Sequence, residues 1–128
     1  MAGEASPRPR LLILDDEARI LSALRRALRR EGYDIVTFET AEDALHELRE
    51  RPVDAILTDQ MMPGMSGLEF LRRSVECCPD AVRMLITGWT ETLPQDQIES
   101  LRVRALITKP WDDARLKTTL RKLLIDGP

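Results

Sequence analysis

Five polar residues each follow directly after a short apolar run, where a strand would end. They are Asp15, Asp16, Asp59, Thr87 and Lys109. In a parallel sheet the carboxyl ends of the strands meet at one edge, and ligands of open α/β sheets bind in the crevice beyond that edge. We therefore expect these side chains, which are scattered along the sequence, to converge in space.

Three carboxylates brought together at Asp15, Asp16 and Asp59 would repel one another, by on the order of 4 kcal/mol per close pair at an effective dielectric near 20. A divalent cation would compensate this repulsion. Oxygen ligands without histidine or cysteine favour Mg²⁺, which keeps several waters and is often shared with a phosphate oxygen. The sequence therefore predicts a site for a phosphoryl group.

Within such a site a carboxylate can act as the nucleophile and become an aspartyl phosphate. Asp59 is the candidate nucleophile. The Lys109 ammonium would add a second positive charge beside the transferring group, and the Thr87 hydroxyl could donate a hydrogen bond to a phosphate oxygen.

The elements that must position these residues alternate between strand and helix. Apolar runs of strand length occupy residues 11–14, 33–38, 55–58, 82–86 and 103–108. Between and after them, helical periodicity predicts five helices. The first covers 17–30, and the others begin near Thr40, Ser66 and Thr92 and after Pro110.

Capping patterns support three of these helix starts. Thr40 precedes Asp43, Ser66 precedes Glu69 and Thr92 precedes Gln95, each by three residues. The helix after Ser66 is expected to bury Leu68, Leu71 and Val75. The last helix is expected to bury Leu116, Leu120, Leu123 and Leu124.

Strands that are apolar almost throughout indicate a sheet covered on both faces. The predicted fold is therefore α/β: a three-layer, doubly wound sandwich with a five-stranded parallel sheet. The chain of 128 residues suits one domain. We expect residues 1–9 to form a flexible leader, 10–125 the domain, and 126–128 a tail or a truncated linker.

Composition excludes several function classes. A net charge of −3 does not suggest a nucleic-acid partner, and the apolar runs are too short to span a membrane. Without a secretory signal, we expect the cytoplasm. Cys77 and Cys78 are neighbours and do not suit a disulfide. His46 is interpreted as a surface or half-buried residue, and the arginines of the first helix chiefly as a solvated face, with kinase docking as the alternative.

Four segments in this order resemble the response-regulator receiver domain of two-component signalling, from about Arg10 to Ile125. They are LLILDD ending at Asp16, TDQMMPGMSG ending at Gly67, LITG ending at Gly88, and ITKP ending at Pro110. The resemblance implies a flavodoxin-like strand order 2-1-3-4-5 and a cis Lys109–Pro110 bond.

The resemblance also implies roles for individual residues. Asp59 would be the phosphoacceptor, with Thr87 and Lys109 contacting the phosphoryl group. The Mg²⁺ ligands would be Asp16 and Asp59, the Met61 backbone carbonyl and, largely through water, Asp15. A histidine kinase or phosphotransfer protein would supply the phosphoryl group. Phosphorylation would alter the face formed by the fourth helix, the fifth strand and the fifth helix. An output domain, a downstream partner or a second copy of the chain would bind at this face.

The sequence departs from the family at one switch position. Leu106 stands three residues before Lys109, where the family usually carries Tyr or Phe, and an aliphatic side chain cannot rearrange as the aromatic one does. Thr87, the other switch residue, is present. Bulky Met61 and Trp89 overlook the pocket, and we expect them to slow attack of water on the acyl phosphate; a surface or partner-contact role for Trp89 is the alternative.

Three functional classes are compatible with the residues. The first is a phosphoacceptor module whose only catalysis is its own phosphorylation and dephosphorylation. The second is a receiver-like interaction module that works without phosphorylation. The third, a phosphatase with an aspartyl-phosphate intermediate, lacks its Asp-x-Asp motif and room for a cap domain. Taken singly, Asp16 could instead cap the first helix, and Lys109 could be a solvated charge.

Overall fold

A computed structural model describes residues 8–88 and 92–125 of the chain. Strands and helices alternate over this part, as the sequence predicts. In chain order they are β1 (Arg10–Leu14), α1 (Ala18–Leu28), β2 (Asp34–Phe38), α2 (Ala41–Glu50), β3 (Ala55–Asp59), α3 (Gly67–Cys77), β4 (Val82–Gly88), α4 (Gln95–Ser100), β5 (Val103–Lys109) and α5 (Asp113–Leu124). The expected leader (apart from residues 8 and 9), tail and Trp89 lie outside the described residues.

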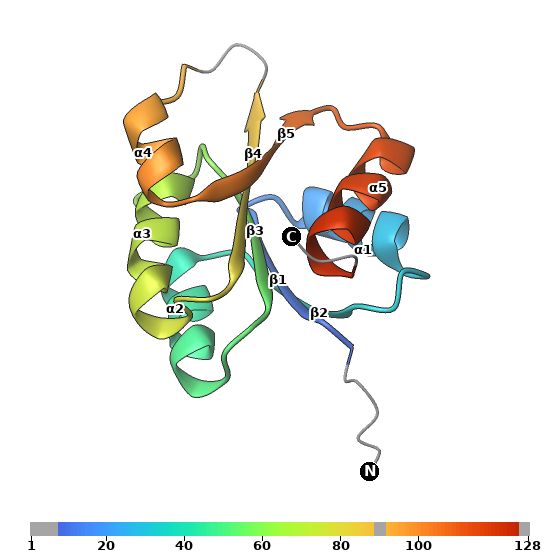
Figure 1. Cartoon of the computed structure of the whole chain (residues 1–128), viewed down its shortest axis with the longest axis horizontal. Helices are drawn as coiled ribbons and strands as arrows, with labels where there is room; N and C mark the ends of the chain where they lie inside the picture. The colour runs from blue at the N-terminus through green and yellow to red at the C-terminus, as the bar shows by residue number, and fades with distance from the viewer. Residues whose placement is uncertain (1–7, 89–91, 126–128) are drawn as a thin grey trace.

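The five strands form one parallel sheet in the order β2-β1-β3-β4-β5 (Figure 1). This confirms the flavodoxin-like order. β1 pairs with β3 in the interior of the sheet, where Leu12 is in register with Ile56. On its other side β3 pairs with β4, where Asp59 is in register with Ile86. The point at which the chain reverses its direction of winding therefore lies between β1 and β3, at whose carboxyl ends the acidic residues stand.

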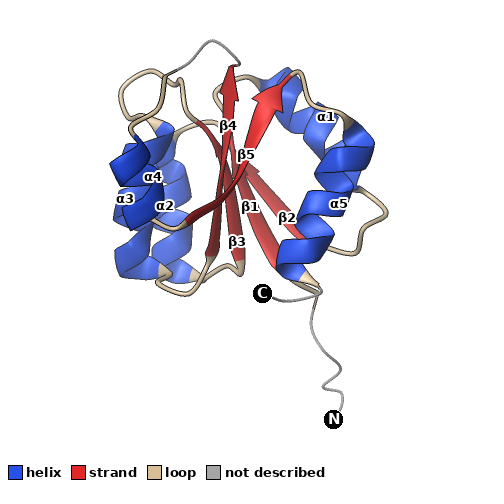
Figure 2. Cartoon of the chain, turned by 45° about the horizontal axis from the view of Figure 1, so that its top comes forward, coloured by secondary structure: helices blue, strands red, loops and turns tan. Residues whose placement is uncertain are grey.

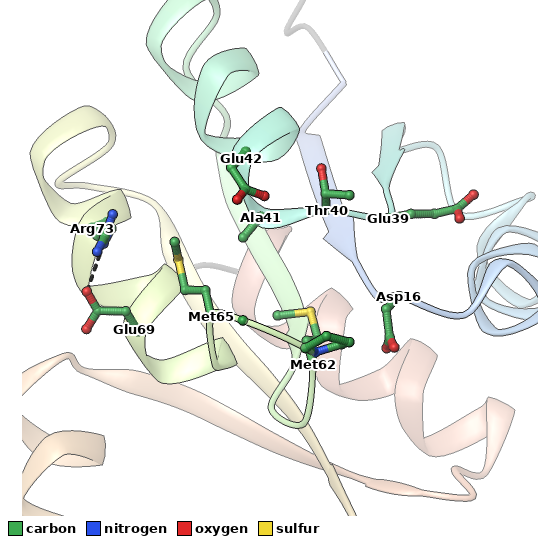
Figure 3. Close-up of a pocket in the computed structure, with 11 residues that line it drawn as sticks. Asp16, Glu39, Thr40, Ala41, Glu42, Met62, Met65, Glu69 and Arg73 are labelled. Atoms are coloured by element: carbon green, nitrogen blue, oxygen red, sulfur yellow. Dashed lines mark hydrogen bonds and ion pairs between the residues drawn. The ribbon is translucent and has the colours of Figure 1, made fainter.

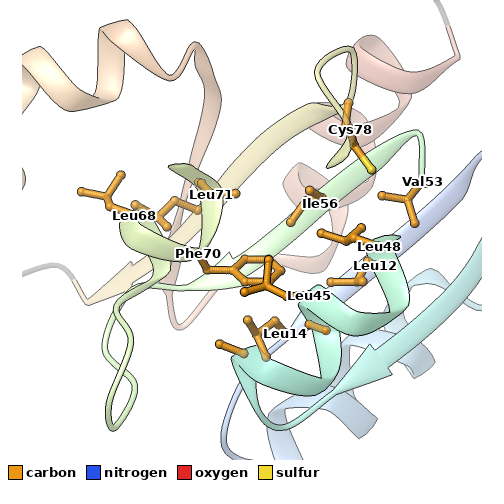
Figure 4. Close-up of a cluster of buried hydrophobic side chains, with 14 of the residues drawn as sticks. Leu12, Leu14, Leu45, Leu48, Val53, Ile56, Leu68, Phe70, Leu71 and Cys78 are labelled. Atoms are coloured by element: carbon orange, nitrogen blue, oxygen red, sulfur yellow. The ribbon is translucent and has the colours of Figure 1, made fainter. Parts of the chain in front are cut away.

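Helices cover both faces of the sheet, which confirms the three-layer prediction. Helices α2, α3 and α4 lie on one face and α1 and α5 on the other (Figure 2). Residues 11–14 of β1 are completely buried, because each side chain meets one helical layer or the other. Figure 4 shows the core under α2 and α3, where Phe70 packs among leucines of β1, α2 and α3.

Strand β5 differs from the expected pattern because its burial alternates. Ile107 is 7% exposed, whereas its neighbour Leu106 is 46% exposed. β5 is the edge of the sheet, and the covering helix α4 has only six residues, of which Ile98 alone is buried. The side chain of Leu106 is consequently left at the surface.

Two predicted helix starts are confirmed by their caps. The Thr40 hydroxyl accepts a hydrogen bond from the Asp43 N–H, and the Ser66 hydroxyl accepts one from the Glu69 N–H. The first helix, predicted over 17–30, covers 18–28 with Glu17 and Arg29 as its flanking residues.

Two predictions about helices were wrong. Thr92 does not cap α4, which begins at Gln95 after Pro94. The ring of a proline disfavours helical geometry in the residue before it, so the helix cannot start earlier. Val75 is 37% exposed rather than buried, because it lies at the margin of a face centred on Leu71 and Ser74.

The last helix buries Leu116 and Leu120 as expected, but Leu123 and Leu124 are only partly buried. The expectations for the cysteines and for His46 agree with the structure. Cys77 and Cys78 are free thiols, and His46 is exposed. Within the described ranges, no helix has both the length and the apolar content needed to cross a membrane.

Candidate functional site

Three carboxylates meet at the carboxyl edge of the sheet. Asp15 follows β1, Asp16 comes next, and Asp59 is the last residue of β3. One oxygen from each lies within 4.8 Å of the others. Asp15 is completely buried and Asp59 is 4% exposed, whereas Asp16 reaches solvent. The convergence predicted from the sequence is therefore present for all three.

Lys109 brings the opposing charge to this cluster from the end of β5. Its Nζ lies 3.3 Å from Asp15 Oδ2 and 3.3 Å from Asp59 Oδ1. Glu17 Oε1 is 4.0 Å from the same nitrogen. The peptide bond between Lys109 and Pro110 is cis, as the resemblance implied. Lys109 is thus part of the site and not a solvated charge at a strand end.

Burial and mutual repulsion perturb the ionisation of these groups. Burial, followed by the charge of Asp15, raises the pKa of Asp59 to about 6. Burial also raises the pKa of Asp15, although the Glu17 N–H donates a hydrogen bond that favours its charged form. Burial opposes the charge of Lys109 as well, but Asp15 and Asp59 outweigh it and raise the pKa of the ammonium.

The cluster fits a hard divalent cation by its donor set and by an incompletely paired oxygen. Three carboxylates face a single ammonium, so negative charge is in excess. Asp15 Oδ2 is buried, and among the described residues its one partner is the Lys109 ammonium at 3.3 Å, which it shares with Asp59. Oxygen donors at this spacing suit Mg²⁺, which requires few protein ligands. Asp16 does not serve as a helix cap, since Glu17 occupies that position and makes no side-chain bond there.

The other predicted site residues have different surroundings. Thr87 is 7% exposed and lies on β4 one residue beyond Ile86, the partner of Asp59 in the sheet. Its neighbour in β5 is Thr108. Met61 is 68% exposed, and Leu106 on β5 is 46% exposed. Thr87 is therefore a buried residue at the same end of the sheet as the carboxylates, whereas Leu106 lies partly at the surface.

The loop from β3 to α3 is held by residues that the sequence reasoning did not single out. The Gln60 side chain accepts a hydrogen bond from the Leu68 N–H at 2.9 Å, and the Gln60 carbonyl accepts one from the Gly67 N–H at 3.0 Å. A methyl group on Gly67 would overlap the Asp59 carbonyl oxygen and lie 2.9 Å from Leu85 Cδ1. Only glycine fits at this position. In the sequence, Gly67 stood out only as the end of the TDQMMPGMSG segment, which gives no reason for the glycine.

A hollow of about 620 Å³ adjoins the acidic cluster (Figure 3). Asp16 forms one wall, Glu39 and Glu42 lie on the β2–α2 side, and Met62 and Met65 come from the loop after β3. The exposed carboxylate of Asp16 is thereby accessible from outside, while Asp15 and Asp59 lie deeper.

Comparison with known proteins identifies the class of protein that this fold and site define. The family described as the response regulator receiver domain matches residues 11–121. The chain belongs to this family of two-component response regulators. The resemblance read from four sequence segments is confirmed.

Relatives of several lengths share this domain. The chain is 42% identical over 115 residues to the hydrogenase transcriptional regulatory protein HoxA of Bradyrhizobium diazoefficiens, a match covering 88% of the chain and 23% of that protein. It spans less than a quarter of HoxA. By contrast, it is 32% identical to the response regulator receiver protein CpdR of Brucella abortus, over 91% of the chain and 97% of that protein.

Solved structures agree with the architecture. The signal receiver domain of an HD domain-containing protein from Pseudomonas fluorescens Pf-5 superposes with a TM-score of 0.84 at 30% identity, covering 91% of this chain and 94% of the other. A CheY-like receiver domain protein from Methanospirillum hungatei JF-1 gives 0.85 at 25% identity, covering 93% and 95%.

Proposed function

We propose that the chain is a phosphoacceptor module whose Asp59 takes a phosphoryl group from a phosphohistidine, carried by a histidine kinase or a phosphotransfer protein. The observation that carries the proposal is the placement of Lys109 Nζ 3.3 Å from both buried carboxylates, Asp15 and Asp59. A lysine whose ammonium lies between two buried carboxylates, beside an acidic pocket suited to a metal ion, can stabilise an incoming phosphoryl group.

The proposed transfer is a displacement at phosphorus. An oxygen of the Asp59 carboxylate attacks the phosphorus, so that a P–O bond forms while the P–N bond to the donor imidazole breaks. The imidazole nitrogen leaves with the bonding electron pair and can take a proton from water. Because an ionised carboxylate is a much stronger nucleophile than a protonated carboxyl group, the reaction requires Asp59 in its ionised form.

The neighbouring residues have separate tasks in this transfer. The ammonium of Lys109 can move from the carboxylate of Asp59 to an oxygen of the new phosphoryl group, and the Thr87 hydroxyl can donate a hydrogen bond to another. Asp15, Asp16, Asp59 and the Met61 carbonyl would hold Mg²⁺. When bound, this cation supplies positive charge to the transferring group and offsets the repulsion among the carboxylates.

The same site would catalyse only its own turnover. Water attacks the phosphorus of the aspartyl phosphate, the P–O bond to Asp59 breaks, and inorganic phosphate leaves. We propose that Met61 slows this attack by occupying space above the pocket; its Met61→Ala variant would then lose the phosphoryl group faster. An unchanged rate of dephosphorylation would show that Met61 does not slow the attack of water.

A docking face for the phosphodonor adjoins Lys109. A largely apolar hollow of about 450 Å³ is lined by Ile20, Lys109, Pro110 and Trp111. It lies between the start of α1 and the loop after β5, so a partner seated there would stand beside the reacting groups. We propose that the donor protein binds at this face, and that the chain acts in the cytoplasm, where such a donor obtains its phosphoryl group from ATP.

We propose that the phosphorylation signal reaches a partner through the face formed by α4, β5 and α5. Leu106 is the exposed apolar residue at its centre. A downstream partner, an output domain or a second copy of the chain could bind there, and neither nucleic acid nor a membrane is proposed as a direct partner. Because Leu106 already lies partly at the surface, the switch would act through Thr87 and the neighbouring backbone rather than through rotation of a side chain at 106.

The test is phosphorylation with a small donor. The protein is incubated with acetyl phosphate and Mg²⁺, and its intact mass is measured alongside Asp59→Asn and, as a control, Asp80→Asn, which removes an exposed carboxylate from the turn before β4. We expect one phosphoryl group on the parent and on Asp80→Asn, none on Asp59→Asn, and none when a chelator replaces Mg²⁺.

One observation favours a second candidate, a receiver-like module that binds its partner without phosphorylation. An exposed aliphatic residue stands at the position where the family uses an aromatic switch residue, so the partner face is available in the unmodified state. The same experiment separates the two. A folded protein that binds Mg²⁺ but gains no phosphoryl group from any donor would support this second function.

A further inference from the structure

Four arginines surround a hollow at the other end of the molecule from the carboxylates. The hollow has a volume of about 380 Å³, and its lining residues are Arg8, Arg25, Arg26, Arg29, Tyr33, Asp34 and Ile35. Arg25 and Arg26 come from the second half of α1, Arg29 follows that helix directly, and Arg8 precedes β1. Tyr33 precedes β2, and Asp34 and Ile35 begin this strand, which forms an edge of the sheet.

The positive charge of this hollow is not neutralised by the described residues. Among the described residues, the one hydrogen bond made by an arginine side chain that lines the hollow joins Arg25 to the Thr37 hydroxyl at 3.4 Å, and no carboxylate forms an ion pair with Arg26 or Arg29. Asp34 is the one acid in the lining, and it faces Arg10, whose Nε lies 3.7 Å from Asp34 Oδ2. Four arginine residues thus line one hollow in a chain whose net charge is −3.

The ordinary structural roles of arginine account for only part of this arrangement. Cations in the last turn of a helix interact favourably with the helix dipole, and Arg25 and Arg26 occupy that turn of α1. This effect does not explain Arg8, which reaches the same hollow from a different segment. Nor does it explain why the carboxylates near the end of α1 pair elsewhere, as Glu31 does with Arg121 on α5.

The chemistry of the lining selects a class of ligand. Guanidinium groups bind phosphate oxygens through pairs of parallel hydrogen bonds, and several arginines around one hollow suit an anion with several charges. A volume of about 380 Å³ matches a small-molecule site better than an extended protein interface. We propose that the hollow binds a linked polyphosphate group, as found in inorganic polyphosphate and in nucleoside di- and triphosphates.

This site is separate from the proposed phosphorylation site. The carboxylates and Lys109 stand at the carboxyl ends of β1, β3 and β5, whereas the hollow adjoins the amino-terminal end of β2 and the carboxyl end of α1. The two sites therefore lie at opposite ends of the strands. Binding at the hollow can therefore be measured in the absence of Mg²⁺, independently of whether Asp59 accepts a phosphoryl group.

The experiment is an amide NMR titration of the full chain, with a chelator present and at low ionic strength, using inorganic tripolyphosphate, ATP and adenosine. We expect saturable shifts over residues 25–35 with tripolyphosphate and ATP and none with adenosine. Similar affinities for the first two would mean that the phosphates alone are recognised. Tighter binding of ATP, with an added shift at Ile35, would mean that the nucleoside contributes.

Matched variants test whether the hollow itself is responsible. Arg25→Gln and Arg29→Gln should each weaken tripolyphosphate binding roughly tenfold, since each removes a charge-assisted contact. Arg30→Gln, on an exposed neighbour that does not line the hollow, should change it less than about twofold. All three residues are exposed, and the amide spectra of the variants verify folding.

Three results would overturn the proposal. The first is the absence of saturable binding of tripolyphosphate. The second is a shift pattern centred on Asp15, Asp59 and Lys109, which would assign the anion to the other site. The third is an equal loss of affinity in Arg29→Gln and Arg30→Gln, which would reduce the effect to the net charge of the surface.

Discussion

At the scale of single residues, the surroundings of Asp59 in the folded protein disfavour the charged form of its carboxyl group. The carboxylate is 4% exposed and shares its surroundings with Asp15, and its pKa is raised to about 6 from the ordinary 3.8. Lys109 offsets this penalty only in part. A metal ion and then a phosphoryl group would supply the favourable interactions that the free carboxylate lacks.

Replacement of Asp59 should therefore stabilise the metal-free protein. Because its folded-state pKa exceeds the unfolded value, the folded state binds more protons between about pH 4 and 6, and stability falls as pH rises through this window. Asp59→Asn has no such charge. We expect it to raise the free energy of unfolding at pH 7.5 in a chelator, by at most about 3 kcal/mol.

Urea unfolding of both proteins at several pH values checks this. The advantage of Asp59→Asn should shrink as pH falls from 7.5 and approach zero below about pH 3, where Asp59 is protonated in both states. Addition of Mg²⁺ at pH 7.5 should stabilise the parent and leave Asp59→Asn less affected. A destabilised Asp59→Asn protein at pH 7.5 would contradict this description of the charge.

Removal of the Lys109 ammonium should strengthen Mg²⁺ binding but slow phosphorylation. In Lys109→Met the carboxylates lose the cation that competes with Mg²⁺, so we expect Mg²⁺ to raise the melting temperature at a several-fold lower concentration than in the parent. Phosphorylation by acetyl phosphate should become slower. Lys122→Met, on the exposed side of α5, is the control that should change neither. Weaker Mg²⁺ binding in Lys109→Met would show that the lysine is not a competing charge.

At the scale of elements, β5 combines a buried and an exposed apolar neighbour. Ile107 faces the core beneath α5, whereas Leu106 lies at the surface. Ile107→Ala should cost about 2–4 kcal/mol of stability and Leu106→Ala less than about 0.5 kcal/mol. Chemical denaturation of both variants measures this. A cost for Leu106→Ala as large as that for Ile107→Ala would mean that Leu106 is covered by a partner or a second copy in solution.

The loop between β3 and α3 should depend on Gly67 more than on Gly64. A methyl group on Gly67 meets the backbone of Asp59 and Gln60, so the loop must move; one on Gly64 meets nothing within 4 Å, and only its φ of +81° opposes a side chain. We expect Gly67→Ala to cost about 2–3 kcal/mol and Gly64→Ala about 1 kcal/mol. Gly67→Ala should also phosphorylate more slowly, because Asp59 begins this loop. Equal costs in urea unfolding would argue against the close approach.

The elements show where reasoning from sequence succeeded and where it failed. Strand positions were predictable because the apolar runs are short and bounded by turn residues. The start of α4 differs from the prediction because Pro94 disfavours helical geometry at Leu93, so the capping pattern at Thr92 does not begin a helix. Arg83 was not recognised as buried, although its guanidinium donates to the carbonyls of Cys78, Pro79 and Leu101. No local pattern marks such a contact, since it depends on the loop just before β4 and on the end of α4 folding around the same side chain.

At the scale of the whole molecule, the parallel topology is what assembles the site. Asp15, Asp59 and Lys109 come from three strands that are far apart in sequence, and the sheet aligns their carboxyl ends. This convergence could be predicted from the sequence because every strand runs in the same direction. The contacts of Glu17, Gln60 and Gly67 could not, because they depend on how individual loops settle against the sheet.

The two ends of the molecule also differ in charge. Carboxylates dominate the edge where the strands end, and arginines surround the hollow beside the start of β2. A small chain with a modest net charge of −3 thus has two regions of opposite sign. The net value alone gave no indication of this separation, since it averages over the surface.

The central claim is that Asp59 is the residue that carries the phosphoryl group. The most direct measurement treats the protein with acetyl phosphate and Mg²⁺, reduces the acyl phosphate with borohydride, and locates the modified residue by peptide mass spectrometry. Reduction converts a phosphorylated aspartate to homoserine. The account predicts homoserine at position 59 alone, and only when Mg²⁺ was present. Homoserine at another aspartate, or none in a folded, Mg²⁺-bound protein, would contradict it.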